Sequence, residues 1–159
     1  KALLNNTPDV VKALQKLLSE ESALKSELDT LQRAHAIRLK KELLASSIER
    51  SGYRLFVLQG EEKADTIKDI AFQLRGELQE PFVFVAATTE GARGLLSVML
   101  SEEAVTLGLH AGNLVKEAAR LIQGGGGGQP HFATAGGKDA NGLPQALELI
   151  LSRVDAHAR

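Results

Sequence analysis

Residues 123–137 read QGGGGGQPHFATAGG, and this segment determines how the rest of the chain must be arranged. Five consecutive glycines are costly to hold in one conformation, because glycine loses more backbone freedom on ordering than any other residue. A linker between two domains is excluded, since only about thirty residues follow Gly128, too few for an independent domain. Those residues must fold back on the preceding chain. We therefore expect 124–137 to be an internal glycine-rich loop whose backbone approaches something that a Cβ atom would exclude.

The glycine segment matches neither of the two common phosphate-binding motifs. Gly137 and Lys138 are followed by Asp139 rather than by Ser or Thr, so the P-loop pattern is not met. A Rossmann loop follows a strand and opens a helix, whereas a helical pattern precedes this run. A nucleotide-binding loop of either type is therefore not indicated.

Outside the glycine segment, residues 51–159 show strand and helix patterns. Apolar runs predict strands at 53–58, 82–86 and 95–100, with a further short strand at 105–107. Amphipathic spacing predicts helices at 61–78, 109–122 and 143–154. The expected fold class is an α/β (α+β) globular domain with a mixed sheet, formed by residues 51–159.

A long helical pattern precedes this domain. No glycine or proline lies between Asp9 and Arg50, and Leu17, Leu24 and Leu31 are spaced seven residues apart. Residues 1–50 are expected to form a coiled-coil-like helical arm, either one long helix or a hairpin of two. Its apolar stripe must pack on a partner helix, on a second copy of the chain, or on the rest of the protein.

Composition narrows the function classes further. The chain has 159 residues, 43% of them hydrophobic, and no cysteine, which excludes disulfides, thiolate zinc sites and cysteine nucleophiles. No apolar run approaches the ~20 residues that span a bilayer, and no signal peptide is visible, so we expect a cytoplasmic protein without a membrane partner. The first residue is Lys1 rather than methionine, and we expect the chain to be a piece of a longer protein.

The ionisable residues form no recognisable catalytic or metal-binding pattern. No two of the four histidines have the i, i+4 spacing of a helical metal pair, and no strained nucleophile elbow is present. The net charge is −1, with the acidic excess in residues 51–108 and mildly basic flanks. A strong affinity driven by phosphates alone is not indicated.

One helix combines cations with the approach to the glycine segment. Asn113, Lys116 and Arg120 lie three and four residues apart, on the side of helix 109–122 opposite its apolar face. Such a face could hold a phosphate backbone, and an ordinary solvated helix face is equally consistent with the pattern.

Three motifs together resemble a known family. HAGNLVK at 110–116, GGGGGQPHFATAGGK at 124–138 and LPQALE at 143–148 are similar to the C-terminal domain of alanyl-tRNA synthetase, a member of the DHH-associated group. The resemblance covers the whole chain, including the helical arm. The combined motif is long and specific, whereas a glycine run alone would not be.

The resemblance implies a parent enzyme, an ATP-dependent alanine–tRNA ligase. It implies that the parent also clears mischarged serine or glycine at an editing site with a zinc-binding motif. Neither centre matches this chain, so we expect no catalytic residues, metal or cofactor here, with ATP, magnesium and zinc in the parent. The resemblance further implies a domain that holds the outer corner of the alanine tRNA and links aminoacylation to editing, with an arm that can form a homodimer.

Carried over by position, the resemblance gives a set of expected RNA-binding residues on helix 109–122 and the glycine segment. They are Asn113, Lys116, Arg120, Gly124, Gly125, Gly126, Gly127, Gly128, Gln129, His131, Gly136, Gly137 and Lys138. Family members often have a basic residue at the position of Gln129 and an Asp at that of His131. The absence of a fixed positive charge at Gln129 argues against a direct phosphate contact there.

Two other readings remain open at the level of sequence. The chain could be the substrate-gripping lobe of a DHH-type phosphoesterase, whose related loop holds the phosphate or sugar of a nucleotide; such a parent needs an Asp-His-His domain upstream. It could also be a structural dimerisation module in which RNA contact is minor.

Overall fold

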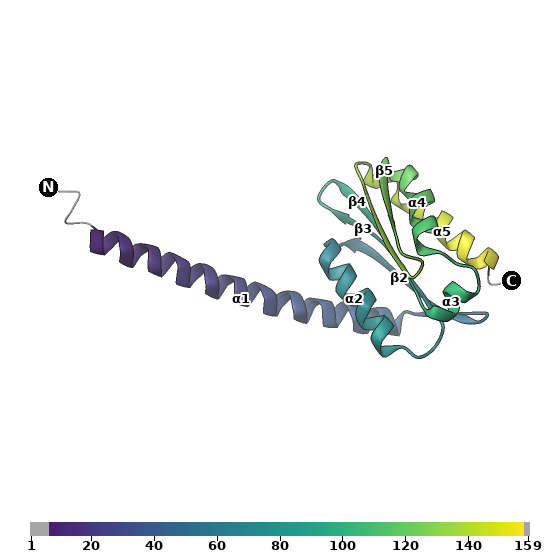
Figure 1. The fold of residues 1–159 in the computed structure, drawn as a ribbon, viewed down its shortest axis with the longest axis horizontal. Helices are drawn as coiled ribbons and strands as arrows, with labels where there is room; N and C mark the ends of the chain where they lie inside the picture. Colours follow the sequence, from purple (N-terminus) through teal and green to yellow (C-terminus); the bar gives the residue numbers. More distant parts are fainter. Residues whose placement is uncertain (1–6, 158–159) are drawn as a thin grey trace. The chain divides into compact units, whose positions relative to one another are not determined.

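The structure, a computed structural model, describes residues 7–157 and contains two compact units that divide after Arg38 (Figure 1). The first unit is the greater part of one helix, α1 (Thr7–Ala45). Of the two arrangements that the sequence left open, a single helix is the one observed, since no glycine or proline interrupts it. Residues 39–45 of α1 belong to the second unit, where Leu43 is buried and the Lys40 Nζ lies 2.7 Å from Glu77 Oε1.

Helix α1 ends five residues before the end of the predicted arm of residues 1–50, and residues 1–6 of that arm lie outside the described part of the chain. The helix ends at Ala45, and residues 48–50 form a short strand, β1 (Ile48–Arg50), antiparallel to β2 (Tyr53–Glu61). The expectation of helix up to Arg50 is wrong because a tight turn follows. Gly52, at φ +95°, reverses the chain so that Arg50 pairs with Tyr53.

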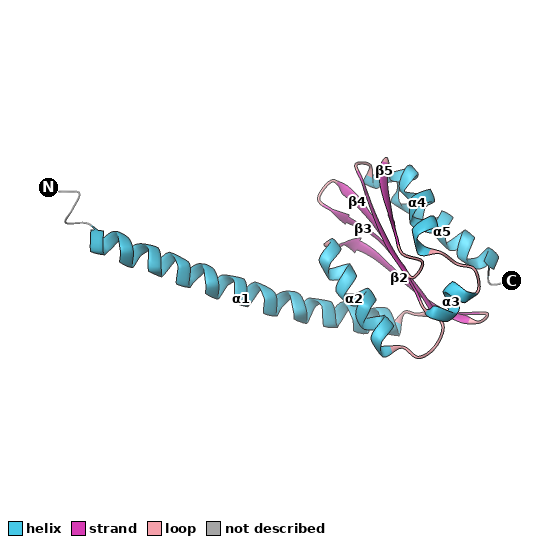
Figure 2. Cartoon of the chain, viewed as in Figure 1, coloured by secondary structure: helices cyan, strands magenta, loops and turns pink. Residues whose placement is uncertain are grey.

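The second unit is built on a six-stranded mixed sheet (Figure 2). Its order is β1-β2-β3-β4-β6-β5, with β3 at Phe82–Glu90, β4 at Arg93–Leu100, β5 at Gly124–Gly128 and β6 at Phe132–Gly137. Strands β2 and β3 are parallel, joined through helix α2 (Ala64–Glu77), and the other pairings are antiparallel. The predicted fold class, an α/β domain with a mixed sheet, is confirmed.

Helices cover both faces of this sheet. Helices α4 (Ala111–Ala119) and α5 (Leu143–His157) pack on one face, and α2 packs on the other (Figure 2). Alternation along the strands divides the apolar side chains between the faces. On β3, Val83 and Val85 join the core beneath α4 and α5, while the buried Phe82 and Phe84 are outside that cluster.

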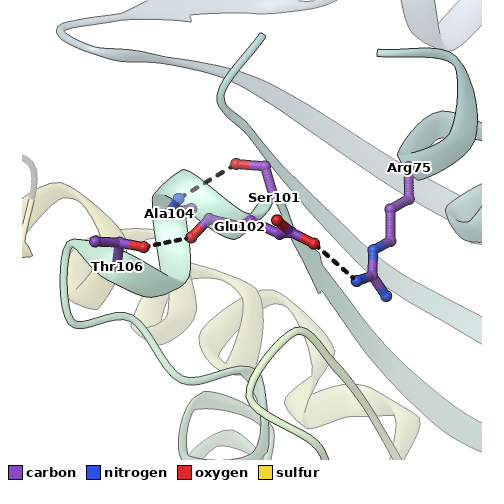
Figure 3. Close-up of polar contacts among 5 residues, drawn as sticks. All are labelled: Arg75, Ser101, Glu102, Ala104 and Thr106. Atoms are coloured by element: carbon purple, nitrogen blue, oxygen red, sulfur yellow. Dashed lines mark hydrogen bonds and ion pairs between the residues drawn. The ribbon is translucent and has the colours of Figure 1, made fainter. Parts of the chain in front are cut away.

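The predicted strand at 105–107 is wrong, because this segment is helical: α3 spans Glu102–Thr106. Figure 3 shows the reason. The Ser101 Oγ accepts a hydrogen bond from the Ala104 N–H at 3.3 Å and so caps the helix, and the Thr106 hydroxyl donates to the Glu102 carbonyl at 2.9 Å. The first turn also carries the acidic Glu102 and Glu103, which the helix dipole favours.

The expected loop at 124–137 is also wrong, because this segment is a β-hairpin. Strand β5 pairs antiparallel with β6 from Gly124 opposite Gly137 to Gly128 opposite Ala133. The Gln129 N–H donates to the Phe132 carbonyl at 2.8 Å and closes the turn. Pairing with β6 satisfies the N–H and C=O groups of β5 that point toward β6 and holds the glycines in place without side chains, while β5 remains the edge strand of the sheet.

Candidate nucleic-acid interface

The glycines of β5 divide into two sets by the face on which a side chain would lie. A Cβ atom at Gly124 would lie 2.6 Å from the Gly137 Cα, one at Gly126 would lie 2.5 Å from the Ala135 Cα, and one at Gly128 would lie 2.7 Å from the Ala133 Cα. Real Cβ contacts are not this short. These three glycines are therefore required by the close approach of β5 to β6.

Gly125 and Gly127 lie on the opposite face and have a different environment. A Cβ atom at either position would meet nothing within 4 Å, and both residues are exposed. Neither has a positive φ. Nothing within the described residues, 7–157, thus requires glycine at these two positions.

Strand β6 contributes the other two predicted glycines. At Gly137 a Cβ atom would lie 2.6 Å from the Ile122 Cγ1, so glycine is needed there for packing on the turn after α4. At Gly136 the nearest atom is the Arg93 Nη2, 3.3 Å from the Cβ position. The Arg93 guanidinium therefore lies over Gly136, on the hairpin face that also carries Gly125.

Arg93 is a further candidate for this surface, and the sequence pattern did not indicate it. It is exposed, and no ion pair or side-chain hydrogen bond involves it among residues 7–157. It lies at the start of β4, far from the glycine run in sequence, and only the pairing of β4 with β6 brings it there. No local motif signals this contact.

Helix α4 packs against the side of the β5–β6 hairpin that points toward the core. Contact is closest at Gly112, where a Cβ atom would lie 2.8 Å from the Gly128 carbonyl oxygen. Lys116 follows Gly112 by one helical turn and therefore lies on the same side of α4, next to β5. Asn113, Lys116 and Arg120 are all exposed, and no salt bridge in the described part of the chain involves either cation.

The turn of the hairpin is fixed to both α4 and β4. The Ala111 N–H donates to the Pro130 carbonyl at 2.8 Å, and the Leu100 N–H donates to the His131 carbonyl at the same distance. Gln129 is exposed at this end, and the His131 side chain is half-buried. Lys138 is exposed at the other end, directly after β6.

The structure thus brings the predicted RNA-binding residues together on α4, on the 3-10 turn after it (Arg120–Ile122), on the β5–β6 hairpin and directly after β6, while their role in binding stays a prediction. Lys116 lies on α4 and Arg120 on the turn that leads from α4 into β5, whereas the Arg93 guanidinium lies on the other face of the hairpin. Half of the backbone N–H and C=O groups of an edge strand point away from its single neighbour. The resulting surface is a bare strand edge between cations.

The described part of the chain shows neither a cluster of metal-binding side chains nor a membrane-spanning helix. Residues 7–157 contain no group of three or more His, Cys, Asp or Glu side chains placed to hold a metal ion. No helix in this range is long and apolar enough to cross a membrane.

Comparison with known proteins identifies the family. The model of the DHHA1 domain matches residues 52–156, and the chain belongs to this family. It is 48% identical to the alanine–tRNA ligase of Porphyromonas gingivalis over 156 residues, which are 98% of this chain and 18% of the ligase. It is likewise 48% identical to that of Bacteroides fragilis over 151 residues, 95% of this chain and 17% of the ligase. The chain therefore spans less than a fifth of the curated relatives that it matches.

Solved structures agree with this assignment at the level of the fold. The C-Ala domain from Aquifex aeolicus alanyl-tRNA synthetase superposes with a TM-score of 0.59 at 23% identity, covering 69% of this chain and 96% of that domain. RecJ from Thermus thermophilus, in complex with Mg²⁺, superposes with a TM-score of 0.56 at 15% identity, covering 82% of this chain and 19% of RecJ. The resemblance to the C-terminal domain of alanyl-tRNA synthetase, expected from the three sequence motifs, is confirmed.

Proposed function

We propose that this chain is the tRNA-binding C-terminal domain of an alanine–tRNA ligase. In this role it holds the outer corner of the alanine tRNA and links aminoacylation to editing in the rest of the enzyme. The proposal is supported by the similarity to alanine–tRNA ligases, which extends over 98% of the chain. For the phosphoesterase alternative, RecJ offers a likeness of fold alone, at 15% identity.

The observation that carries the proposal is the pair Gly125 and Gly127. Packing explains the other glycines of β5, but these two face open space. Glycine at such a position allows a partner to approach the backbone more closely than any side chain would permit. The partner we propose is the ribose–phosphate backbone of RNA.

The surrounding charges suit this partner. Lys116 and Arg120 would contact phosphates on the α4 side of β5, and Arg93 would contact phosphates on the other side. The outward N–H and C=O groups of β5 would bond ribose hydroxyls or the edges of unstacked bases, as proteins commonly do when they recognise RNA by shape. Asn113, Gln129, His131 and Lys138 extend the same surface at its two ends.

A salt-dependent titration tests this proposal. Fluorescence anisotropy with labelled alanine tRNA is measured over a range of KCl concentrations for the unaltered chain, Arg93→Ala and the double variant Lys116→Ala/Arg120→Ala. Each lost phosphate contact is expected to lower the slope of log K against log salt by about one. Lys68→Ala, which removes an exposed lysine from α2, is the matched control and keeps the full slope. Unchanged slopes in all the variants would show that RNA does not use this surface.

The catalytic steps of the parent ligase, aminoacylation and editing, are proposed to take place outside this chain. We propose that ATP, magnesium and zinc act in parts of the parent ligase outside this chain, and that the parent works in the cytoplasm. The test is activity of the whole ligase with and without residues equivalent to this chain. Loss of tRNA affinity with intact formation of alanyl-adenylate is the expected result, and a loss of adenylate formation would contradict the assignment.

We also propose that the first unit pairs with a second copy of itself. Large apolar side chains stay exposed along α1, among them Leu17, Leu24 and Leu31, which are 60%, 65% and 61% exposed. Their seven-residue spacing is the pattern of a coiled-coil seam. Replacing all three by serine is expected to convert a dimer to a monomer in analytical ultracentrifugation. A monomer before the replacement would reject the proposal.

A further inference from the structure

Two aromatic rings meet beside the turn of the β5–β6 hairpin. Phe132 opens β6, and Phe72 comes from α2, the helix on the sheet face away from α4 and α5 (Figure 2). Their ring centroids lie 5.1 Å apart with an interplanar angle of 61°. This is an edge-to-face contact, which aromatic side chains favour over a parallel sandwich. Because the rings are not parallel, each keeps at least one face that the other ring does not cover.

This pair lies at the surface, unlike the other aromatic pair among residues 7–157. Phe56 and Phe82 also meet edge to face, at 6.2 Å, but both are almost fully buried. Phe72 is 43% exposed, and Phe132 is half-buried. Core packing therefore accounts for the first pair, whereas the ring of Phe72 is open to a partner.

Strand alternation places Phe132 on the same face of the hairpin as the two open glycines. Residues two apart on β6 share a face, so Phe132 lies with Thr134 and Gly136, while the alternate residues of β6 are buried in the core. Gly127 pairs with Thr134, and Gly125 pairs with Gly136. We call this set of five residues the open face of the hairpin.

The two ends of the open face differ in chemistry. Aromatic rings lie at the end that carries Phe132, and the Arg93 guanidinium lies over Gly136 at the other end, with its Nη2 3.3 Å from the Cβ position of that glycine. Four residues of strand separate the two ends, which is about 13 Å. Between them no side chain is larger than that of Thr134. A nucleotide has the matching parts, since its base is flat and apolar on its faces and its phosphate is charged.

We propose that Phe72 and Phe132 form a stacking platform for an unstacked base of the RNA. The base lies against the exposed ring of Phe72, and Phe132 holds that ring beside the hairpin. The adjoining ribose–phosphate backbone then crosses the bare strand toward Arg93. Proteins commonly stack unpaired RNA bases on aromatic side chains, and such stacking tolerates any base. This inference rests on the proposed function, to which it adds a base contact beside the phosphate contacts.

The first test uses tryptophan fluorescence, because the chain contains no tryptophan of its own. Phe72→Trp places a single indole at the platform, and a base stacked on that indole quenches its emission. We expect quenching that saturates as alanine tRNA is added. Ile48→Trp is the matched control, since Ile48 is 45% exposed on β1, at the opposite edge of the sheet from β5. No quenching at position 72 while tRNA is bound, or equal quenching in both variants, would overturn the proposal.

The second test separates stacking from apolar packing. Phe72→Leu keeps a large apolar side chain and removes the ring, whereas Phe72→Tyr keeps the ring. The loss of one base–aromatic stack weakens binding by about fivefold to 150-fold. We expect that loss of tRNA affinity in the leucine variant and binding within about twofold in the tyrosine variant. The salt dependence should not change in either variant, because no phosphate contact is removed.

The outcomes distinguish this inference from the proposed function. If the variants that remove cations lower the salt slope while Phe72→Leu binds as tightly as the unaltered chain, RNA uses the surface without the platform, and this inference alone fails. Weaker binding by Phe72→Leu without quenching in Phe72→Trp would show that the ring acts through packing, which also overturns stacking. If the unaltered chain binds no tRNA, the proposed function itself fails.

Discussion

Strand β5 contains glycines that pack against β6 and glycines that face open space, so two matched variants can be compared. We predict that Gly125→Ala/Gly127→Ala folds normally and loses tRNA affinity, whereas Gly126→Ala loses stability. All three changes add one methyl group to the same strand. They differ only in the face to which that methyl group points.

The magnitudes follow from the contacts. At Gly126 the added carbon would lie 2.5 Å from the Ala135 Cα, whereas carbon atoms in contact lie about 3.5–4.0 Å apart, so the strands must separate by about 1 Å. Overpacking of this kind costs about 1–3 kcal/mol. At Gly125 and Gly127 the added carbons meet nothing within 4 Å. Alanine there is expected to stabilise the fold by about 0.4–1 kcal/mol per position, because it restricts the unfolded chain.

For tRNA affinity we expect the larger loss in Gly125→Ala/Gly127→Ala, the variant whose folding stability is not reduced. If RNA lies against Gly125 and Gly127, two methyl groups push it away from the strand and lengthen its hydrogen bonds. A hydrogen bond between uncharged groups contributes about 0.5–1.5 kcal/mol, so the loss of two such bonds, one at each glycine, weakens binding roughly fivefold to a hundredfold. Urea unfolding and tRNA anisotropy on the same preparations separate the two quantities. A Gly125→Ala/Gly127→Ala protein that is stable and binds tRNA within twofold of the unaltered chain would refute the reasoning.

Three further predictions concern the framework that positions the interface. Burial, together with a hydrogen bond from its hydroxyl to Asp155 Oδ1 at 2.9 Å, raises the pKa of Tyr53 to about 12. Because the folded-state pKa lies above the ordinary value of 10, the neutral tyrosine stabilises the fold below pH 10, and this contribution is lost as the pH rises toward 12. Urea unfolding from pH 9 to 12 should show that slope in the unaltered chain and not in Tyr53→Phe. Ser101→Ala should lower the unfolding free energy by about 1–3 kcal/mol, since it removes the cap of α3 and leaves the Phe82 N–H without its 3.1 Å acceptor; Ser101→Thr, which keeps the hydroxyl, should restore most of it. Gly142→Ala should destabilise by more than Gly76→Ala in thermal melts, because a Cβ atom at Gly142 would lie 2.7 Å from the Leu121 carbonyl carbon while one at Gly76 meets nothing within 4 Å; equal melting temperatures would contradict this packing.

Local sequence pattern predicted the strands and helices whose side chains repeat with a clear period. The strands at 53–58, 82–86 and 95–100 and the helix at 61–78 are present, with ends that differ by a few residues. The errors fall where pattern is weak. Glycine carries no side chain and gives no period, so the run 124–128 could not be recognised as a strand. Residues 48–50 and 102–106 depend on a turn and a cap that were not anticipated.

The candidate site shows the same division. The predicted residues on α4 and the hairpin are close in sequence, so their proximity followed once the chain was expected to fold back. Arg93 comes from another strand and could not be found without the register of β4 with β6. His110 lies inside the motif HAGNLVK at 110–116, but only the extended backbone at this residue lets its side chain cap α4 by accepting a hydrogen bond from the Asn113 N–H.

The sequence by itself determined the family, the mixed α/β class and the residues available for binding, because periodicity and motifs are local properties of a chain. Only the tertiary structure decided which glycines serve packing and which are open to a partner. That distinction depends on the face that each residue presents after strands distant in sequence have paired. Five identical residues in a row do not show which of them will contact β6. Only the pairing of β5 with β6 decides that three of these glycines pack closely and two remain open.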